Sequence, residues 1–161
     1  MADNGPQPHP RMAELDYFVG TWRANGRFHE TPFGAEKPIE MTITGSREDR
    51  GFWTVIRTEE LVTAQNPDPL TARYLWGFDA QAGEFVAEWF DGNGGRATQR
   101  SAGWQDDKLV FEGTITLGGH TVPLRDSFTR TGADHYHHIG ETDLGQGWIT
   151  VDDEDATRVP A

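Results

Sequence analysis

Asp126, His137 and Arg100 are the residues with which this sequence could do chemistry, because the predicted strand register turns all three toward one interior. An aspartate beside a histidine makes a tuned general acid or base, and an arginine can anchor a carboxylate or enolate oxygen. Buried charges in an apolar wall are costly unless they are paired. The same trio is also explained by mutual pairing that only fixes the register, or by ligand anchoring without chemistry.

His135 and His137 are separated by one residue, which on a strand places both imidazoles on one face. Asp126, Asp152 or Glu141 could complete a His/carboxylate metal site with them. Because a His-x-His pair is as typical of surface or hydrogen-bonded histidines, we predict no metal site and no cofactor. The sequence has no cysteine, which excludes thiolate ligands, thiolate nucleophiles and disulfides.

Aromatic side chains gather on one face of two neighbouring segments, at alternate positions broken only by Ala87. The turn at 80–83 pairs Tyr74 with Trp89 and Phe78 with Phe85, so one face of this hairpin is aromatic. We expect this face to bind a small, largely apolar or aromatic molecule. The predicted ligand-binding residues are Tyr74, Trp76, Phe78, Phe85, Trp89, Phe111, Glu60, Glu141 and Trp148.

Segments with a period of two must position these residues, and turn residues such as Gly118-Gly119 separate them. One face is apolar in nearly every segment, so a closed, all-β antiparallel barrel of about ten strands is the simplest solution. The alternative is a filled β-sandwich. The strands are expected near 21–30, 39–48, 51–62, 72–79, 84–91, 96–105, 108–117, 120–129, 134–142 and 147–153.

A short helix is predicted from Pro10 to Val19, before the first strand. Proline suits a helix start, and Gly20 suits the position just past a helix end. The apolar side chains of this segment form one stripe, made of Met12, Leu15, Phe18 and Val19. We therefore predict a disordered N-terminus over 1–9 and a single β-barrel domain over 10–161.

The register of the late hairpin depends on the length of the loop at 130–133. A loop of four residues turns His135, His137 and Glu141 inward, opposite Trp148 and Asp152. A loop of five turns Tyr136 and His138 inward instead. We favour the shorter loop because it buries Ile139 and Trp148.

The formal net charge of -12 bears on partners. An acidic surface repels phosphate backbones and anionic lipids, so we expect neither nucleic acid nor a membrane as partner. No stretch approaches the ~18 apolar residues of a membrane span, and the start of the chain has no apolar signal core. We expect a cytoplasmic protein, either a monomer or a homodimer.

The sequence resembles calycins at Gly20-Thr21-Trp22, just after the predicted helix. In lipocalins a Gly-x-Trp opens the first strand, and its tryptophan packs under the barrel near a basic residue after the last strand. Arg158 is the matching residue here. The segments Leu15 to Trp22, Trp76 to Asp79 and Phe85 to Asp91 also resemble a bacterial calycin-like family of unknown function. The resemblance implies a barrel with an internal ligand cavity.

The opening Gly20-Thr21-Trp22-Arg23 is also similar to the nitrobindin type, a ten-stranded barrel that binds haem through a late histidine. The late histidines here are His135, His137 and His138. Three hypotheses follow. The leading one is a small-molecule-binding barrel, the alternative is a cofactor-independent isomerase, cyclase or lyase acting on an apolar or polyketide-like substrate, and the third is a haem-binding barrel.

Overall fold

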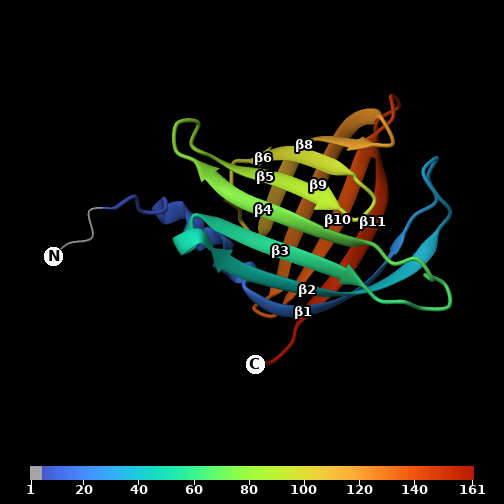
Figure 1. The fold of residues 1–161 in the computed structure, drawn as a ribbon, viewed down its shortest axis with the longest axis horizontal. Helices are drawn as coiled ribbons and strands as arrows, with labels where there is room; N and C mark the ends of the chain where they lie inside the picture. Colours follow the sequence, from blue (N-terminus) through green and yellow to red (C-terminus); the bar gives the residue numbers. More distant parts are fainter. Residues whose placement is uncertain (1–4) are drawn as a thin grey trace.

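The structure is a computed structural model that describes residues 5–161. Ten long antiparallel strands close into a barrel around one interior (Figure 1). Consecutive strands pair except β6 and the two-residue β7, β1 pairs with β11, and a β6–β8 pairing closes the circle. The strands are β1 (Gly20–Phe28), β2 (Lys37–Glu48), β3 (Trp53–Glu60), β4 (Thr71–Asp79), β5 (Glu84–Asp91), β6 (Arg96–Ser101), β7 (Trp104–Gln105), β8 (Lys108–Leu117), β9 (His120–Gly132), β10 (His135–Asp143) and β11 (Trp148–Arg158). The predicted all-β calycin-like barrel is confirmed.

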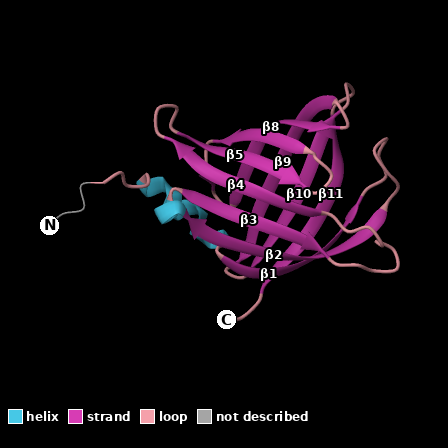
Figure 2. Cartoon of the chain, in the orientation of Figure 1, coloured by secondary structure: helices cyan, strands magenta, loops and turns pink. Residues whose placement is uncertain are grey.

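The predicted N-terminal helix is a 3₁₀ helix, η1 (Pro10–Phe18), which lies at one end of the barrel (Figure 2). Its three buried side chains, Met12, Leu15 and Phe18, recur every three residues, which is the repeat of a 3₁₀ helix. A second 3₁₀ turn, η2 (Asp49–Gly51), links β2 and β3. Within residues 5–161, no helix has the length and apolar character needed to cross a membrane.

The segment before η1 contacts the barrel where the structure describes it. The Nδ1 atom of His9 accepts a hydrogen bond from the backbone N–H of Arg11, and the His9 ring stacks on Phe78 at 4.1 Å. Of the segment 1–9 that the sequence predicted to be disordered, residues 1–4 lie outside the described residues.

Aromatic side chains fill the end of the barrel beside η1. Phe18 lies 5.0 Å from Trp76 between ring centroids, and Trp76 stacks on Phe111 at 5.1 Å. Arg158, the last residue of β11, places its guanidinium 4.1 Å from the Trp22 ring centroid. The placement of Arg158 under Trp22, which the calycin resemblance implied, is therefore confirmed.

The predicted register is wrong between β5 and β6. The predicted strands 84–91 and 96–105 leave a four-residue loop, which would oppose Trp89 to Thr98, but Trp89 pairs with Ala97. The connection is one residue longer than expected because Asp91, the last residue of β5, is not paired with β6. Its Oδ1 instead accepts hydrogen bonds from the amides of Asn93 and Gly95. A slip of one residue exchanges the two faces of a strand, so β6 presents different side chains to the interior.

The register is also wrong between β9 and β10, where the alternative five-residue loop is the correct one. Tyr136 pairs with Arg130 and His138 pairs with Phe128, with a β-bulge between His135 and Tyr136. The bulge absorbs the extra residue. Tyr136 and His138 consequently face the interior, and the favoured four-residue loop is excluded.

The last strand extends beyond its predicted end at 153 and runs to Arg158. Glu154, which lies beyond that predicted end, is only 4% exposed. A second bulge, between Gly140 and Glu141, shifts the β10–β11 register at the point where Asp152 turns inward. Two carboxylates of β11 therefore enter the barrel.

Candidate functional site

A cavity of about 210 Å³ occupies the interior beyond the aromatic cluster. Its lining reaches Phe28 and Leu117, the last residues of β1 and β8 at the end away from η1. Most of the wall is aliphatic or aromatic. The other lining residues include Met41, Ile43, Ile56, Leu70, Ala72, Tyr74, Trp76, Trp89, Ile115, Leu124, Phe128, Tyr136 and Val151.

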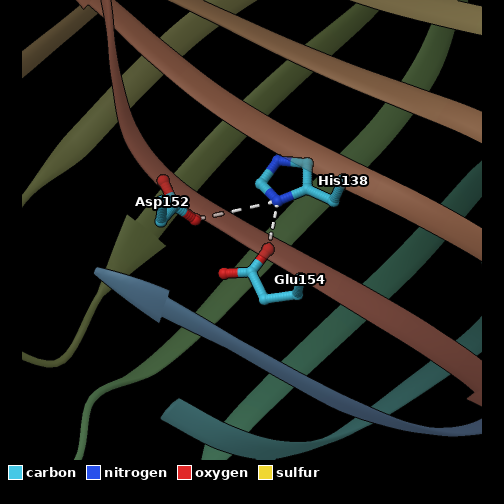
Figure 3. Close-up of side chains that lie close together, drawn as sticks. All are labelled: His138, Asp152 and Glu154. Atoms are coloured by element: carbon cyan, nitrogen blue, oxygen red, sulfur yellow. Dashed lines mark hydrogen bonds and ion pairs between the residues drawn. The ribbon is translucent and has the colours of Figure 1, made fainter. Parts of the chain in front are cut away.

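The largest group of polar side chains in this wall is a cluster of one histidine and three carboxylates. His138 Nδ1 lies 2.6 Å from Glu154 Oε2 and 3.7 Å from Asp152 Oδ2, as Figure 3 shows. His138 Nε2 lies 2.8 Å from Asp126 Oδ1. The imidazole, on β10, is thus held between carboxylates of β9 and β11. We call these four residues the interior acidic cluster.

Gln99, on β6, fixes the orientation of Asp126. Its side-chain amide donates to Asp126 Oδ2 at 2.8 Å and to the carbonyl of Phe111 at 3.3 Å. Gln99 is 2% exposed. Asp126 therefore has one oxygen held by Gln99 and the other directed at His138.

The charges around His138 determine its protonation. Burial alone would lower the pKa of His138, but the charge of Glu154 and the hydrogen bonds to Asp126 and Glu154 raise it well above its usual range. The surrounding carboxylates therefore favour the charged imidazole, which can donate from both nitrogens.

The pKa of Asp152 is higher than that of an exposed carboxylate. Burial and then the charge of Glu154 raise the pKa of Asp152 well above its usual range, although His138 opposes the shift. This rise in pKa favours the protonated form of Asp152.

Two tyrosines face the same cavity. Burial, followed by the charges of Asp126 and Asp152, raises the pKa of Tyr74 well above its usual range. Burial and the charge of Glu154 do the same to the pKa of Tyr136. Within residues 5–161, neither phenol hydroxyl has a hydrogen-bond partner. Both remain available to a bound molecule.

Glu60 reaches the cavity from β3 but is already satisfied. Its Oε2 accepts hydrogen bonds from the Asn66 side chain at 2.8 Å and from the Leu70 amide at 2.9 Å. Asn66 in turn accepts from Lys37 Nζ at 2.8 Å. Glu60 thus anchors the β3–β4 loop to the wall.

The predicted trio of Asp126, His137 and Arg100 does not form. Arg100 points outward and contacts Asp79 and Glu84, each at 3.3 Å. At Gly113 the backbone of β6 leaves no room for a side chain, because a Cβ there would collide with the Thr98 carbonyl oxygen. Strands β6 and β8 approach closely there, and Gln99 takes the inward position.

The prediction for His137 is also wrong because of a one-residue register shift, which places His137 on the outer face of β10. Its Nδ1 atom lies 2.8 Å from Asp155 Oδ1, and the Asp155 side chain is 82% exposed. His135, on the same face, contacts Thr157. The acid/base hypothesis required His137 and Arg100 to face Asp126 inside the barrel, and neither residue does.

The predicted ligand-binding residues divide into three groups. Tyr74, Trp76, Trp89 and Glu60 line the cavity as predicted. Phe78, Phe85 and Phe111 pack in the core, outside the cavity lining. The predictions for Glu141 and Trp148 are wrong. Glu141 accepts two hydrogen bonds from Arg125 on the outer face. Trp148 is 38% exposed, and its ring packs against the same guanidinium.

Glu154 and Gln99 are the site residues that the sequence prediction missed. The period-two pair Asp152-x-Glu154 carried a signal, because both carboxylates of such a pair face one side of a strand. That signal was hidden by the expected end of the strand at 153. Gln99 was missed through the one-residue slip of β6.

Haem does not fit the residues present. His138 is the late histidine that faces inward, and both of its ring nitrogens contact carboxylates. His135 and His137 are on the outside. A histidine nitrogen directed freely into the cavity, which haem ligation requires, is not found in residues 5–161.

No family model and no curated protein matches the chain. Solved structures do match it. One is that of Rv2717c from M. tuberculosis, with 13% identity, a TM-score of 0.75 and coverage of 96% of this chain and 100% of that one. Another is the S-type phycobiliprotein lyase CPES from Guillardia theta, with 10% identity, a TM-score of 0.59 and coverage of 96% and 99%. At these identities the likeness shows the fold alone, which is a calycin-like β-barrel.

Proposed function

We propose that the protein binds a small molecule inside the barrel, with the apolar or aromatic body of the molecule against the wall and a polar end at the interior acidic cluster. The cavity carries this proposal. Its wall combines aliphatic and aromatic side chains with one polar group of residues, the usual composition of ligand pockets. Phycobiliprotein lyase activity in a barrel of similar fold agrees with a ligand-handling role but does not transfer to this chain.

The size of the cavity limits the ligand. An apolar cavity of ~150 Å³ accommodates benzene, whereas drug-sized ligands occupy pockets of ~300–1,000 Å³. At about 210 Å³, the cavity suits a molecule with one or two small rings or a short branched chain. Tyr74 and Tyr136 offer two free hydroxyls to such a molecule, so it is expected to carry at least one hydrogen-bonding group.

The first test is native mass spectrometry of the full chain purified from its own host, with denaturing analysis of any released compound. A retained small molecule of this size supports the proposal. In parallel, the purified chain is titrated with 2-naphthol, which has a two-ring body and one hydroxyl, and binding is followed by calorimetry and ligand-observed NMR.

A cavity-filling variant separates interior binding from surface binding. Ala72, 7% exposed, lines the cavity, whereas Ala80 lies exposed in the β4–β5 turn. Ala72→Phe is expected to weaken 2-naphthol binding at least ~10-fold, while Ala80→Phe leaves it unchanged. An empty chain from the host together with no 2-naphthol binding, or equal binding by both variants, would overturn the proposal.

A further inference from the structure

We propose that His138, Asp152 and Glu154 form a mononuclear site for a divalent metal ion inside the barrel. One potential ligand atom from each residue lies within 4.8 Å of the other two. The side chains converge from β10 and β11 on one point of the interior (Figure 3). This inference goes beyond the proposed ligand binding and does not depend on it, because the metal can be tested alone.

The second sphere of this site is already in place. Asp126 Oδ1 lies 2.8 Å from His138 Nε2, on the ring edge opposite the two carboxylates. Metal-bound histidines usually donate their other ring N–H to a carboxylate, which fixes the tautomer and the ring orientation. Gln99 holds Asp126 in turn. His138 Nδ1 is therefore the nitrogen presented to Asp152 and Glu154.

The cavity lining has an excess of carboxylates, which a bound cation would balance. Among the residues that the structure describes, the lining contains five carboxylates and neither lysine nor arginine. Two of them, Glu60 and Asp91, are engaged by amide groups. The other three surround His138, and buried carboxylates are costly unless a cation or a proton compensates them. A divalent ion balances Asp152 and Glu154 with a neutral imidazole as third ligand.

An unpartnered group in the wall of the same cavity points to a ligand inside the barrel. Tyr136 is 4% exposed and lines the same cavity, and its hydroxyl has no hydrogen-bond partner within residues 5–161. A water or another exogenous group in the cavity would supply the missing partner.

The donor set selects the class of ion. One imidazole nitrogen and two carboxylate oxygens suit Zn²⁺, Mn²⁺, Fe²⁺ or Co²⁺, and the absence of thiolates disfavours Cu⁺. Three protein ligands leave at least one coordination position open, as in catalytic rather than structural zinc sites. That position faces the cavity, because all three residues line it.

The test uses the full chain after removal of metals with EDTA. Zn²⁺ is titrated by calorimetry, and Co²⁺ is added to record its visible absorption. One ion per chain is expected, with the Co²⁺ bands of a low-coordinate site. His138→Gln, Asp152→Asn and Glu154→Gln are each expected to weaken Zn²⁺ binding by at least ~100-fold, and Asp126→Asn by ~10–100-fold as a second-sphere change.

A matched control lies on the other face of the same two strands. His137 and Asp155 form a histidine–aspartate pair at 2.8 Å that points outward. His137→Gln and Asp155→Asn should leave Zn²⁺ binding unchanged. Loss of binding in these variants but not in His138→Gln, or no Zn²⁺ binding by the wild-type chain, would overturn the proposal.

A measurement on the wild-type chain guards against variants that fail to fold. The ring nitrogens of ¹⁵N-labelled histidines are followed by NMR as Zn²⁺ is added. The Nδ1 signal of His138 is expected to shift with one equivalent, while the signals of His135 and His137 stay in place. The reverse pattern would identify an adventitious surface site and contradict the inference.

Discussion

His138 Nε2 reaches Asp126 Oδ1 at 2.8 Å although the two residues are not opposite each other on their strands. His138 pairs with Phe128, and Asp126 pairs with Gly140. The contact is therefore diagonal, and it is possible because Gly140 places no side chain between them. This diagonal links three strands through one imidazole, since Glu154 of β11 holds the other nitrogen.

Removing the imidazole should be strongly destabilising. In His138→Ala, the buried carboxylates of Asp126 and Glu154 lose their shared partner. Breaking a buried ion pair from one side costs ~3–5 kcal/mol, and we expect a loss of this size in the free energy of unfolding measured with urea. His137→Ala, which breaks an outer-face pair, should cost under ~1 kcal/mol. Equal losses in the two variants would contradict the assignment of the inner pair.

Gly140 is expected to be intolerant of any side chain. A Cβ there would lie 2.2 Å from Asp152 Oδ1 and 3.5 Å from Asp126 Oδ1. Gly140→Ala should therefore displace Asp152 and destabilise the chain by ~1–3 kcal/mol, the usual cost of overpacking. Thermal and urea unfolding measure the loss.

Gly132 provides the control for this substitution, because the nearest atom to a Cβ there is a His135 ring carbon at 3.8 Å. Gly132→Ala is expected to stay within ~0.5 kcal/mol of the wild type. A Gly140→Ala variant as stable as Gly132→Ala would show that Asp152 is not packed against Gly140.

The sequence predicted the barrel well because its strands carry a clear period of two and its turns carry explicit turn residues. Pairings on either side of the Gly118-Gly119 turn, such as Ile115 with Val122, are as predicted. The site was predicted less well because the number of residues in each loop decides which side chains of the next strand face inward. One extra residue at Asp91 and one bulge at Tyr136 exchanged Arg100 for Gln99 and His137 for His138.

Those two errors have a common physical origin. A bulge or a side chain that caps a loop adds a residue without changing the hydrophobic pattern that a sequence displays. Ile139 and Trp148 were assumed to be buried because they are apolar, but Ile139 is half-buried and Trp148 is exposed. Burial of His138 and Glu154 is favourable only because the two side chains contact each other. That contact can be predicted only when the register of β10 against β11 is known.

Arg158 is expected to hold the closed end of the barrel together. It stacks on Trp22 and donates to the carbonyls of Val19 at 2.6 Å and Tyr17 at 2.8 Å. Arg158→Met keeps the aliphatic stem but removes these interactions, and hydrogen bonds from a charged donor contribute ~1.5–3 kcal/mol each. We expect a net loss of ~2–4 kcal/mol in the free energy of unfolding.

Arg23 is the matched control, because it is exposed on β1 next to Trp22. Arg23→Met should change the free energy of unfolding by no more than ~0.5 kcal/mol. If the two variants unfold at the same urea concentration, the guanidinium of Arg158 does not stabilise η1 against the barrel.

The side chain of Asp91 is expected to determine the β5–β6 register. Its Oδ1 accepts from the amides of Asn93 at 2.9 Å and Gly95 at 2.7 Å, which closes the five-residue loop. Asp91→Ala leaves both amides without this acceptor and should cost ~1–3 kcal/mol, whereas Asp91→Asn keeps an oxygen there and should recover most of the loss.

Asp68→Ala, at an exposed loop position, is the control and should be neutral. Hydrogen exchange adds a local readout: the amides of β6 should exchange faster in Asp91→Ala than in Asp91→Asn. Unchanged β6 protection in the alanine variant would mean that the loop backbone alone sets the register.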